Sequence, residues 1–259
     1  MLIENTLLGV IDKEKIAIER LRHFEPEEGY YLAFSGGKDS VCIKALTNMA
    51  GVKYDAHYNV TTIDPPELVR FIREYHPDVK FEMPKEPFLK KLTRMGFPQR
   101  HRRWCCHEYK ERGGDGRFVI TGVRRAESRY RKYRPIIHHC MGYGKRENTM
   151  ILNPIIDWED NDVWEFINKW NLPYCCLYDE GYKRVGCIFC PMNYHRTRDI
   201  ERYPKYTELF IKAFSELWKR RKSEGRKSVD RWQNGEEMFW WWINENREKD
   251  DGQYHLFGD

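Results

Sequence analysis

Short apolar runs alternate with amphipathic stretches over residues 12–170. Buried strands are predicted at residues 30–34, 54–60, 79–81, 117–121 and 150–156. Helices are predicted between and after them, at residues 12–24, 39–50, 65–75, 88–95 and 160–170. Strands that alternate with helices favour an α/β, Rossmann-like fold, with a mostly parallel sheet and helices on both faces.

The C-terminal part has a different pattern. Helices are predicted at residues 206–221 and 236–246, so residues 196–259 are expected to form a helical extension. Residues 1–27 are expected to form an N-terminal helical segment, and residues 28–195 the main domain. Within that domain, residues 97–116 and 129–148 are predicted as irregular loops.

Composition narrows the class of protein. The chain has 45 Lys and Arg against 40 Asp and Glu, and this net charge of +5 is too small for a histone-like binder. No apolar run approaches the ~18 residues that span a bilayer, so no membrane association is expected. We therefore expect a cytoplasmic protein, in which the eight cysteines indicate metal or redox chemistry rather than disulfides.

Residues 35–40, Ser-Gly-Gly-Lys-Asp-Ser, join the first predicted strand to the next helix. Glycines let a ligand approach the backbone closely, and the first N–H groups of a helix have no partners. The segment therefore predicts a phosphate site. Backbone N–H groups and hydroxyls of four residues would hold the phosphates: Ser35, Gly36, Gly37 and Ser40. Lys38 would neutralise charge, and Asp39 would orient the loop or Mg²⁺, or only complement the helix dipole.

Two other strand ends carry side chains suited to the same ligand. Gly122 precedes Arg124 and Arg125, whose planar guanidinium groups suit phosphate or sulfate. The alternative is a surface pair bridged to a nearby acid. Thr61 and Asp64 follow the second strand and would line the nucleoside pocket, or Asp64 would simply cap the next helix.

The cysteines include two patterned groups. Cys105 and Cys106 are adjacent, whereas Cys187 and Cys190 form a Cys-x-x-Cys pair. Four thiolates from two short loops suit tetrahedral zinc or an iron–sulfur cluster. A second tandem pair, Cys175-Cys176, would substitute for a ligand or hold sulfur nearby, although two packed loop cysteines are the simpler interpretation.

These motifs occur in an order that resembles a known family. The segment at 35–40 is similar to the Ser-Gly-Gly-x-Asp-Ser signature of the PP-loop ATP pyrophosphatases, in the adenine nucleotide alpha hydrolase-like superfamily. Further motifs are the Cys-Cys pair, Gly-Val-Arg-Arg-x-Glu-Ser at 122–128, Asp-Trp-x-x-x-Asp-Val-Trp at 157–164 and the stretch at 177–190. Residues 28–195 thus resemble the phosphoadenosine phosphosulfate reductase family, in its iron–sulfur branch.

The resemblance implies a PP-loop nucleotide-binding domain that holds a [4Fe–4S] cluster. Its ligands would be Cys105, Cys106, Cys187 and Cys190, with zinc as the alternative metal. The implied nucleotide is ATP or an adenylylated nucleotide, with Mg²⁺. The resemblance also implies that Arg124 and Arg125 face the substrate anion. We therefore expect the catalytic residues to be Lys38, Asp39, Arg124 and Arg125.

The printed sequence departs from the family's reductases in one respect. Those enzymes use a cysteine near the C-terminus as the nucleophile that attacks sulfate sulfur, and here no cysteine follows Cys190. The leading expectation is therefore ATP-dependent sulfur transfer to a nucleic acid or nucleotide. A sulfonucleotide reductase that forms sulfite is the first alternative. A non-catalytic nucleotide-binding module with structural zinc is the second.

Basic and aromatic residues alternate in the stretch at 129–134, and arginines cluster at 100–103. Such interleaving suits a nucleic-acid backbone with stacked bases, or else a solvated loop beside an anion site. The expected partners are an adenine nucleotide, a tRNA or DNA substrate and a sulfur donor or reductant protein. Oligomerisation stays open.

Overall fold

The computed structural model describes residues 1–7, 9–140, 148–193 and 196–244. The chain separates into two compact units. Unit 1 comprises residues 1–60, 66–83 and 112–185, and unit 2 comprises residues 61–65, 84–111 and 186–259. Each unit is therefore built from segments that are distant in sequence. The predicted division at residues 27 and 195 stays a prediction about domains.

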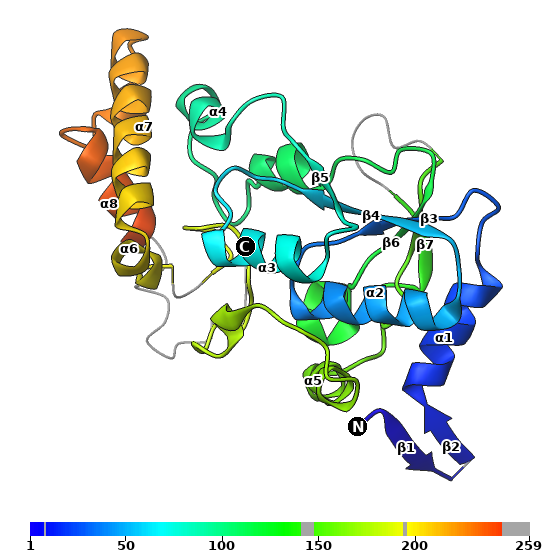
Figure 1. The fold of residues 1–259 in the computed structure, drawn as a ribbon. Coiled ribbons are helices and arrows are strands. Elements are labelled where there is room, and N and C mark those ends of the chain that lie inside the picture. The colour runs from blue at the N-terminus through cyan, green and yellow to red at the C-terminus, as the bar shows by residue number, and fades with distance from the viewer. Residues whose placement is uncertain (8, 141–147, 194–195, 245–259) are drawn as a thin grey trace. The chain divides into compact units, whose positions relative to one another are not determined.

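Unit 1 is built on a six-stranded sheet in the order β5-β4-β3-β6-β8-β7 (Figure 1). Its strands are β3 (Tyr30–Ala33), β4 (Tyr54–Asn59), β5 (Lys80–Glu82), β6 (Phe118–Ile120), β7 (Ile137–His139) and β8 (Met150–Leu152). All neighbours pair in parallel except β7 and β8. With helices on both sides, the fold is the predicted α/β, Rossmann-like class.

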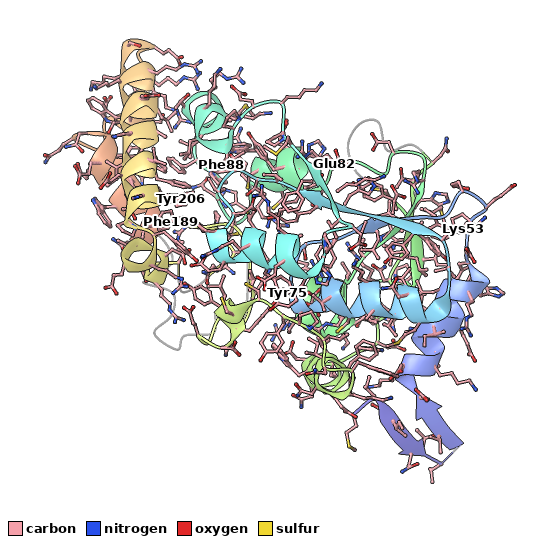
Figure 2. The ribbon with its side chains drawn as sticks, in the orientation of Figure 1. Lys53, Tyr75, Glu82, Phe88, Phe189 and Tyr206 are labelled. Atoms are coloured by element: carbon pink, nitrogen blue, oxygen red, sulfur yellow. The ribbon has the colours of Figure 1, made fainter. Side chains whose placement is uncertain are left out.

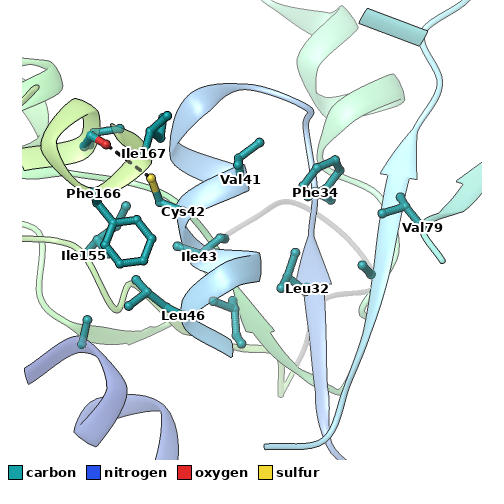
Figure 3. Packing of buried hydrophobic residues seen from close by; sticks show 14 of the residues in the cluster. Leu32, Phe34, Val41, Cys42, Ile43, Leu46, Val79, Ile155, Phe166 and Ile167 are labelled. Carbon is teal, nitrogen blue, oxygen red and sulfur yellow. Dashed lines mark hydrogen bonds between the residues drawn. The ribbon is translucent and has the colours of Figure 1, made fainter. Parts of the chain in front are cut away.

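The main helices of unit 1 are α1 (Lys13–His23), α2 (Lys38–Ala50), α3 (Pro66–Tyr75) and α5 (Asp160–Lys169), close to their predicted bounds. Local chemistry sets their ends. The Asp12 side chain caps α1 by accepting from the Lys15 N–H, and Gly51 ends α2 with φ +70°. Figure 3 shows Cys42 of α2 buried between apolar residues, where its thiol donates to the Val163 carbonyl of α5. Packing is thus the role of Cys42 here.

Several elements of unit 1 were not predicted from the apolar pattern. A hairpin of β1 (Ile3–Thr6) and β2 (Gly9–Asp12) precedes α1, and its residues are mostly exposed. Strand β7 lies in the segment expected to be a loop, of which residues 141–147 are outside the described part. Three short 3₁₀ helices are η2 (Arg125–Glu127), η3 (Arg129–Arg131) and η4 (Cys176–Tyr178).

Unit 2 is helical and contains the predicted C-terminal extension. Its elements are α4 (Phe88–Met95), the π-helical turn η1 (Cys106–Lys110), α6 (Arg198–Arg202), α7 (Pro204–Ser223), the short η5 (Lys227–Val229) and α8 (Gly235–Asn244). Residues 97–116 are therefore not wholly irregular, as expected from the sequence, because the backbone coils from Trp104 to Lys110. The predicted end of the last helix at residue 246 lies outside the described residues.

Aromatic side chains fill the core of unit 2. Phe88 and Phe189, labelled in Figure 2, are buried there with Phe210 and Trp242. The Phe210 and Trp242 rings stack with centroids 6.1 Å apart, and the Trp242 indole donates to the Pro98 carbonyl at 2.7 Å. The run Trp240-Trp241-Trp242 thus packs mainly within its own unit. Among the helices that the structure describes, none is long and apolar enough to cross a membrane.

Candidate nucleotide site and cysteine group

Residues 35–40 form a tight turn between β3 and α2 in unit 1. Gly36 has φ +71°, and a Cβ there would lie 2.6 Å from Leu68 and 2.8 Å from Ile72. Only glycine fits this combination of backbone angle and close packing. Gly37 is the N-cap of α2 and offers no side chain to the helix N–H groups, so the turn leaves room for an external acceptor.

Hydrogen bonds within unit 1 hold this turn in shape. The Ser40 hydroxyl donates to the Gly37 carbonyl at 2.8 Å, and the Ser35 hydroxyl donates to Ser40 at 3.2 Å. The Gly37 N–H points to Ser35 at 3.4 Å. The Tyr178 hydroxyl accepts from the Lys38 N–H at 3.0 Å. The predicted phosphate-binding residues are therefore together, and the amides of Gly37 and Lys38 already have oxygen partners.

Two buried cations beside the turn are neutralised by two carboxylates. The Arg124 guanidinium donates to Asp39 at 2.6 Å and to Asp160 at 3.0 Å. The Lys38 ammonium lies 2.9 Å from Asp160 and 3.6 Å from Asp39. Burial works against the charge of Asp160, but the hydrogen bond and charge of Lys38, and then those of Arg124, lower its pKa below the usual value. The four groups carry no net formal charge.

The other predicted residues of the strand ends divide between the two units. A Cβ at Gly122 would lie 3.0 Å from Asp39, so this glycine allows the close approach that brings Arg124 to α2. Arg125 is exposed, and its guanidinium donates to the Arg134 carbonyl at 3.0 Å. Unit 1 thus brings Gly122 and Arg124 to the turn at residues 35–40, while Arg125 bonds within the following loop.

Thr61 and Asp64 belong to unit 2, where they adjoin the cysteines. The Asp64 carboxylate accepts from the Thr61 N–H and hydroxyl, both at 2.7 Å. The Cys187 thiol donates to the Thr61 hydroxyl oxygen at 3.5 Å, and the Ile188 N–H donates to the Ile63 carbonyl at 2.9 Å. Residues 61–64 thus contact the loop that carries Cys187.

The four patterned cysteines all lie in unit 2 and influence one another. The hydrogen bond between the adjacent thiols raises the pKa of Cys105 and lowers that of Cys106 to about 6. Burial, with the charges of Asp64 and Cys190, raises the pKa of Cys187 to about 11. Ionisation of Cys105 and Cys187 is therefore disfavoured here, and a bound cation would offset this.

Two protein cations act on this group: Arg103, through Cys106, and Lys110. The charge of Cys187, followed by those of Cys190, Asp64 and Cys106, raises the pKa of Lys110 above its usual value. Lys110 ends the π-helical turn that begins at Cys106. Over the described residues, no three Cys, His, Asp or Glu side chains are arranged to hold a single metal ion. The donor set is soft and sulfur-only, which fits an iron–sulfur cluster or zinc in type.

Two residues beside the turn at residues 35–40 were missed by reasoning from the sequence. Asp160 was interpreted only as the start of a helix, and Tyr178 only as part of a motif. No local pattern ties either to residues 35–40, because they lie more than a hundred positions away. The one signal in the sequence was that Asp160 begins a predicted helix that follows the last strand of the sheet.

The strand order and the tight turn at residues 35–40 together define an α/β protein with a PP-loop fold. The chain matches the phosphoadenosine phosphosulfate reductase domain over residues 29–193, and it belongs to this family. An uncharacterized protein of Methanocaldococcus jannaschii is 30% identical over 247 residues, which cover 87% of this chain and 51% of that protein. The adenosine 5'-phosphosulfate reductase of Staphylococcus haemolyticus is 29% identical over 159 residues, 57% of this chain and 61% of that enzyme.

Among solved structures, a phosphoadenylyl-sulfate reductase from Candida auris, in a phosphate complex, is similar with a TM-score of 0.49 and 21% identity. The match covers 66% of this chain and 87% of that one. The chain spans about half the length of the Methanocaldococcus relatives that it matches.

Proposed function

We propose that the chain is an adenine-nucleotide-dependent enzyme of sulfur chemistry that uses ATP to activate an oxygen of a nucleic acid or nucleotide for replacement by sulfur. The observation that carries the proposal is the charge balance at the PP-loop. Lys38 and Arg124 are matched by Asp39 and Asp160, so a triphosphate alone meets no net positive charge. Mg²⁺ that arrives with ATP supplies that charge and accepts carboxylate ligands.

The proposed reaction consists of two displacements. An acceptor oxygen attacks the α-phosphorus of ATP, and pyrophosphate leaves. A sulfur nucleophile from a separate donor then replaces that oxygen, which leaves with AMP. The part of this chain is to hold the phosphates with the first N–H groups of α2, while Lys38 and Arg124 stabilise the charge that develops on pyrophosphate.

The cysteines of unit 2 support a sulfur-related role. Their donor set fits a [4Fe–4S] cluster held by Cys105, Cys106, Cys187 and Cys190, and such a cluster would hold or deliver sulfur when bound. Lys110 would offset part of its negative charge. Zinc bound by the same thiolates would instead make them a structural clip.

An exposed basic segment of unit 1 supports a nucleic acid as the acceptor. Tyr130 and Tyr133 are 101% and 85% exposed, and the Lys132 ammonium lies 5.6 Å from the Tyr133 ring centroid. This segment, residues 129–134, begins five positions after Arg124 along the chain. Exposed rings between cations suit stacked bases and phosphates of a single strand.

Anaerobic purification followed by iron, sulfide and zinc analysis tests the cluster. About four iron and four sulfide per chain would support it, and about one zinc without sulfide would contradict it. The reaction is tested separately with α-labelled ATP, Mg²⁺, bulk tRNA or single-stranded DNA, and sulfide. AMP and pyrophosphate formed only with an acceptor would support ATP-dependent transfer, whereas no such products with any acceptor would contradict it.

A second candidate is sulfonucleotide reduction, favoured by the names of the reductase relatives. In that reaction a thiol displaces AMP or its 3'-phosphate from the sulfate sulfur, and a dithiol donor then releases sulfite. Incubation with adenylylsulfate or its 3'-phosphate, plus thioredoxin, separates the two candidates. Sulfite release would favour the reductase, and its absence together with ATP cleavage would favour the transferase.

A further inference from the structure

The Asp160 carboxylate occupies an unusual position at the PP-loop. One of its oxygens, Oδ1, lies 2.9 Å from the Lys38 ammonium and 3.0 Å from a guanidinium nitrogen of Arg124. Both cations are buried, with 6% and 3% of their surface exposed, whereas the Asp160 side chain is 63% exposed. A solvent-facing carboxylate therefore bridges two desolvated cations with a single oxygen.

A phosphate oxygen would need the same two partners. The Arg124 guanidinium is also held by Asp39 and by the Trp158 carbonyl, so it stays in place when one partner leaves. Asp160, at the first position of α5, has solvent on its open side and can leave without burying its charge. An anion that binds here thus displaces Asp160 rather than Asp39.

We infer that Asp160 is a specificity-determining residue, an internal anion that occupies the phosphate position until a metal-bound nucleotide replaces it. Bare anions such as phosphate, sulfate or metal-free pyrophosphate must break both contacts and then lie beside the displaced carboxylate, which repels them. Mg²⁺-bound pyrophosphate groups do not incur this repulsion, because the displaced carboxylate faces a dication. The inference rests on the proposed nucleotide site, and it adds that Asp160 makes this site select the Mg²⁺-bound nucleotide over the metal-free one.

The test measures calorimetric binding of inorganic pyrophosphate and of ATP to the whole chain, each with Mg²⁺ and with EDTA. Asp160→Asn removes the charge and keeps the shape. We expect it to bind metal-free pyrophosphate about tenfold more tightly than the unaltered chain. The ratio of ATP affinities with and without Mg²⁺ should shrink by a similar factor.

The control is Asp78→Asn, because Asp78 also pairs with a lysine of α2. Its carboxylate lies 2.8 Å from Lys44 and is 53% exposed, away from the PP-loop turn. It should leave both affinities unchanged. Asp160→Ser provides a second neutral variant if the amide variant does not fold, and circular dichroism reports folding of each.

Three results would decide the matter. Tighter metal-free binding in the Asp160 variants alone supports the inference. Equal or weaker binding of metal-free pyrophosphate in those variants, while the unaltered chain binds Mg²⁺–ATP, overturns it and leaves the nucleotide site intact. Failure of every protein to bind ATP under any condition overturns the proposed function itself.

Discussion

The PP-loop of unit 1 and the cysteine group of unit 2 differ in how their charges are balanced. At the PP-loop, two buried cations are already balanced by Asp39 and Asp160, and hydrogen bonds fix the turn. In the cysteine group, neighbouring thiols and burial raise the pKa of Cys105 and Cys187, whereas the Cys105 hydrogen bond and the charges of Lys110 and Arg103 lower the pKa of Cys106. A balanced site can select among ligands, whereas an unbalanced site depends on its ligand for stability.

The largest expected effect is at the cysteine group. Cys187→Ala removes a thiolate from the proposed ligand set, so iron should fall from about four atoms to less than one per chain. Colorimetric iron and sulfide analysis after anaerobic purification measures this. Cys140→Ser, a change outside the proposed ligand set, should keep the iron. Equal iron in the two variants would remove Cys187 from the ligands.

At the PP-loop, a larger side chain at Gly37 should weaken nucleotide binding. Gly37 has ordinary backbone angles, and a Cβ there would lie 3.4 Å from the Tyr178 hydroxyl, an ordinary contact. Gly37→Val should therefore fold but fill the space for phosphates, weakening Mg²⁺–ATP binding at least about 100-fold. Gly37→Ala should weaken it less. Titration calorimetry checks the series, and a valine variant within threefold of the unaltered chain would move the phosphate site elsewhere.

The two sites also differ in how far the sequence could predict them. The strand–turn–helix at residues 30–50 is local, so the PP-loop could be inferred from neighbouring residues, as could the parallel sheet. Asp160 and Tyr178 could not, since chain folding over a distance brings them to α2. Likewise Thr61 contacts Cys187 in unit 2, a pairing that no periodicity encodes, and its place in a nucleoside pocket stays a prediction.

Missed secondary structure has a similar cause. The β1–β2 hairpin exposes most of its residues, including Leu7 and Val10, so it lacks the alternation that marks a half-buried strand. Strand β7 has three residues, Ile137–His139, in a basic segment, and only its antiparallel pairing with β8 defines it. Short elements of this kind depend on partners rather than on propensity.

A pH titration tests the stability of unit 1 at a group outside both sites. Burial, and then the charge of Lys44, lowers the pKa of His76 from 6.5 to about 4. The unfolded chain therefore binds the proton more tightly between these values, and unfolding free energy should fall as pH decreases from 6.5 to 4. The contribution is at most about 3 kcal/mol.

Urea unfolding at several pH values measures this loss. His76→Gln cannot titrate, so its unfolding free energy should change less over this range than that of the unaltered chain. His139→Gln, a change at an exposed histidine of β7, should keep the original slope. Identical slopes in all three proteins would mean that His76 is protonated as easily in the folded chain as in the unfolded one.

The smallest expected effect concerns Tyr178, whose hydroxyl accepts a hydrogen bond from the Lys38 N–H at 3.0 Å. Tyr178→Phe keeps the ring against Trp164 but leaves this amide without its oxygen, so unfolding free energy should fall by about 1 kcal/mol. The freed N–H can then donate to a phosphate, and Mg²⁺–ATP affinity should rise about twofold. Tyr174→Phe, which breaks a 3.0 Å bond to Asp179, should leave that affinity unchanged. Weaker ATP binding in Tyr178→Phe would mean that the hydroxyl contacts the nucleotide directly. Charge balance at Lys38 and Arg124 would then be only part of what the PP-loop offers a nucleotide.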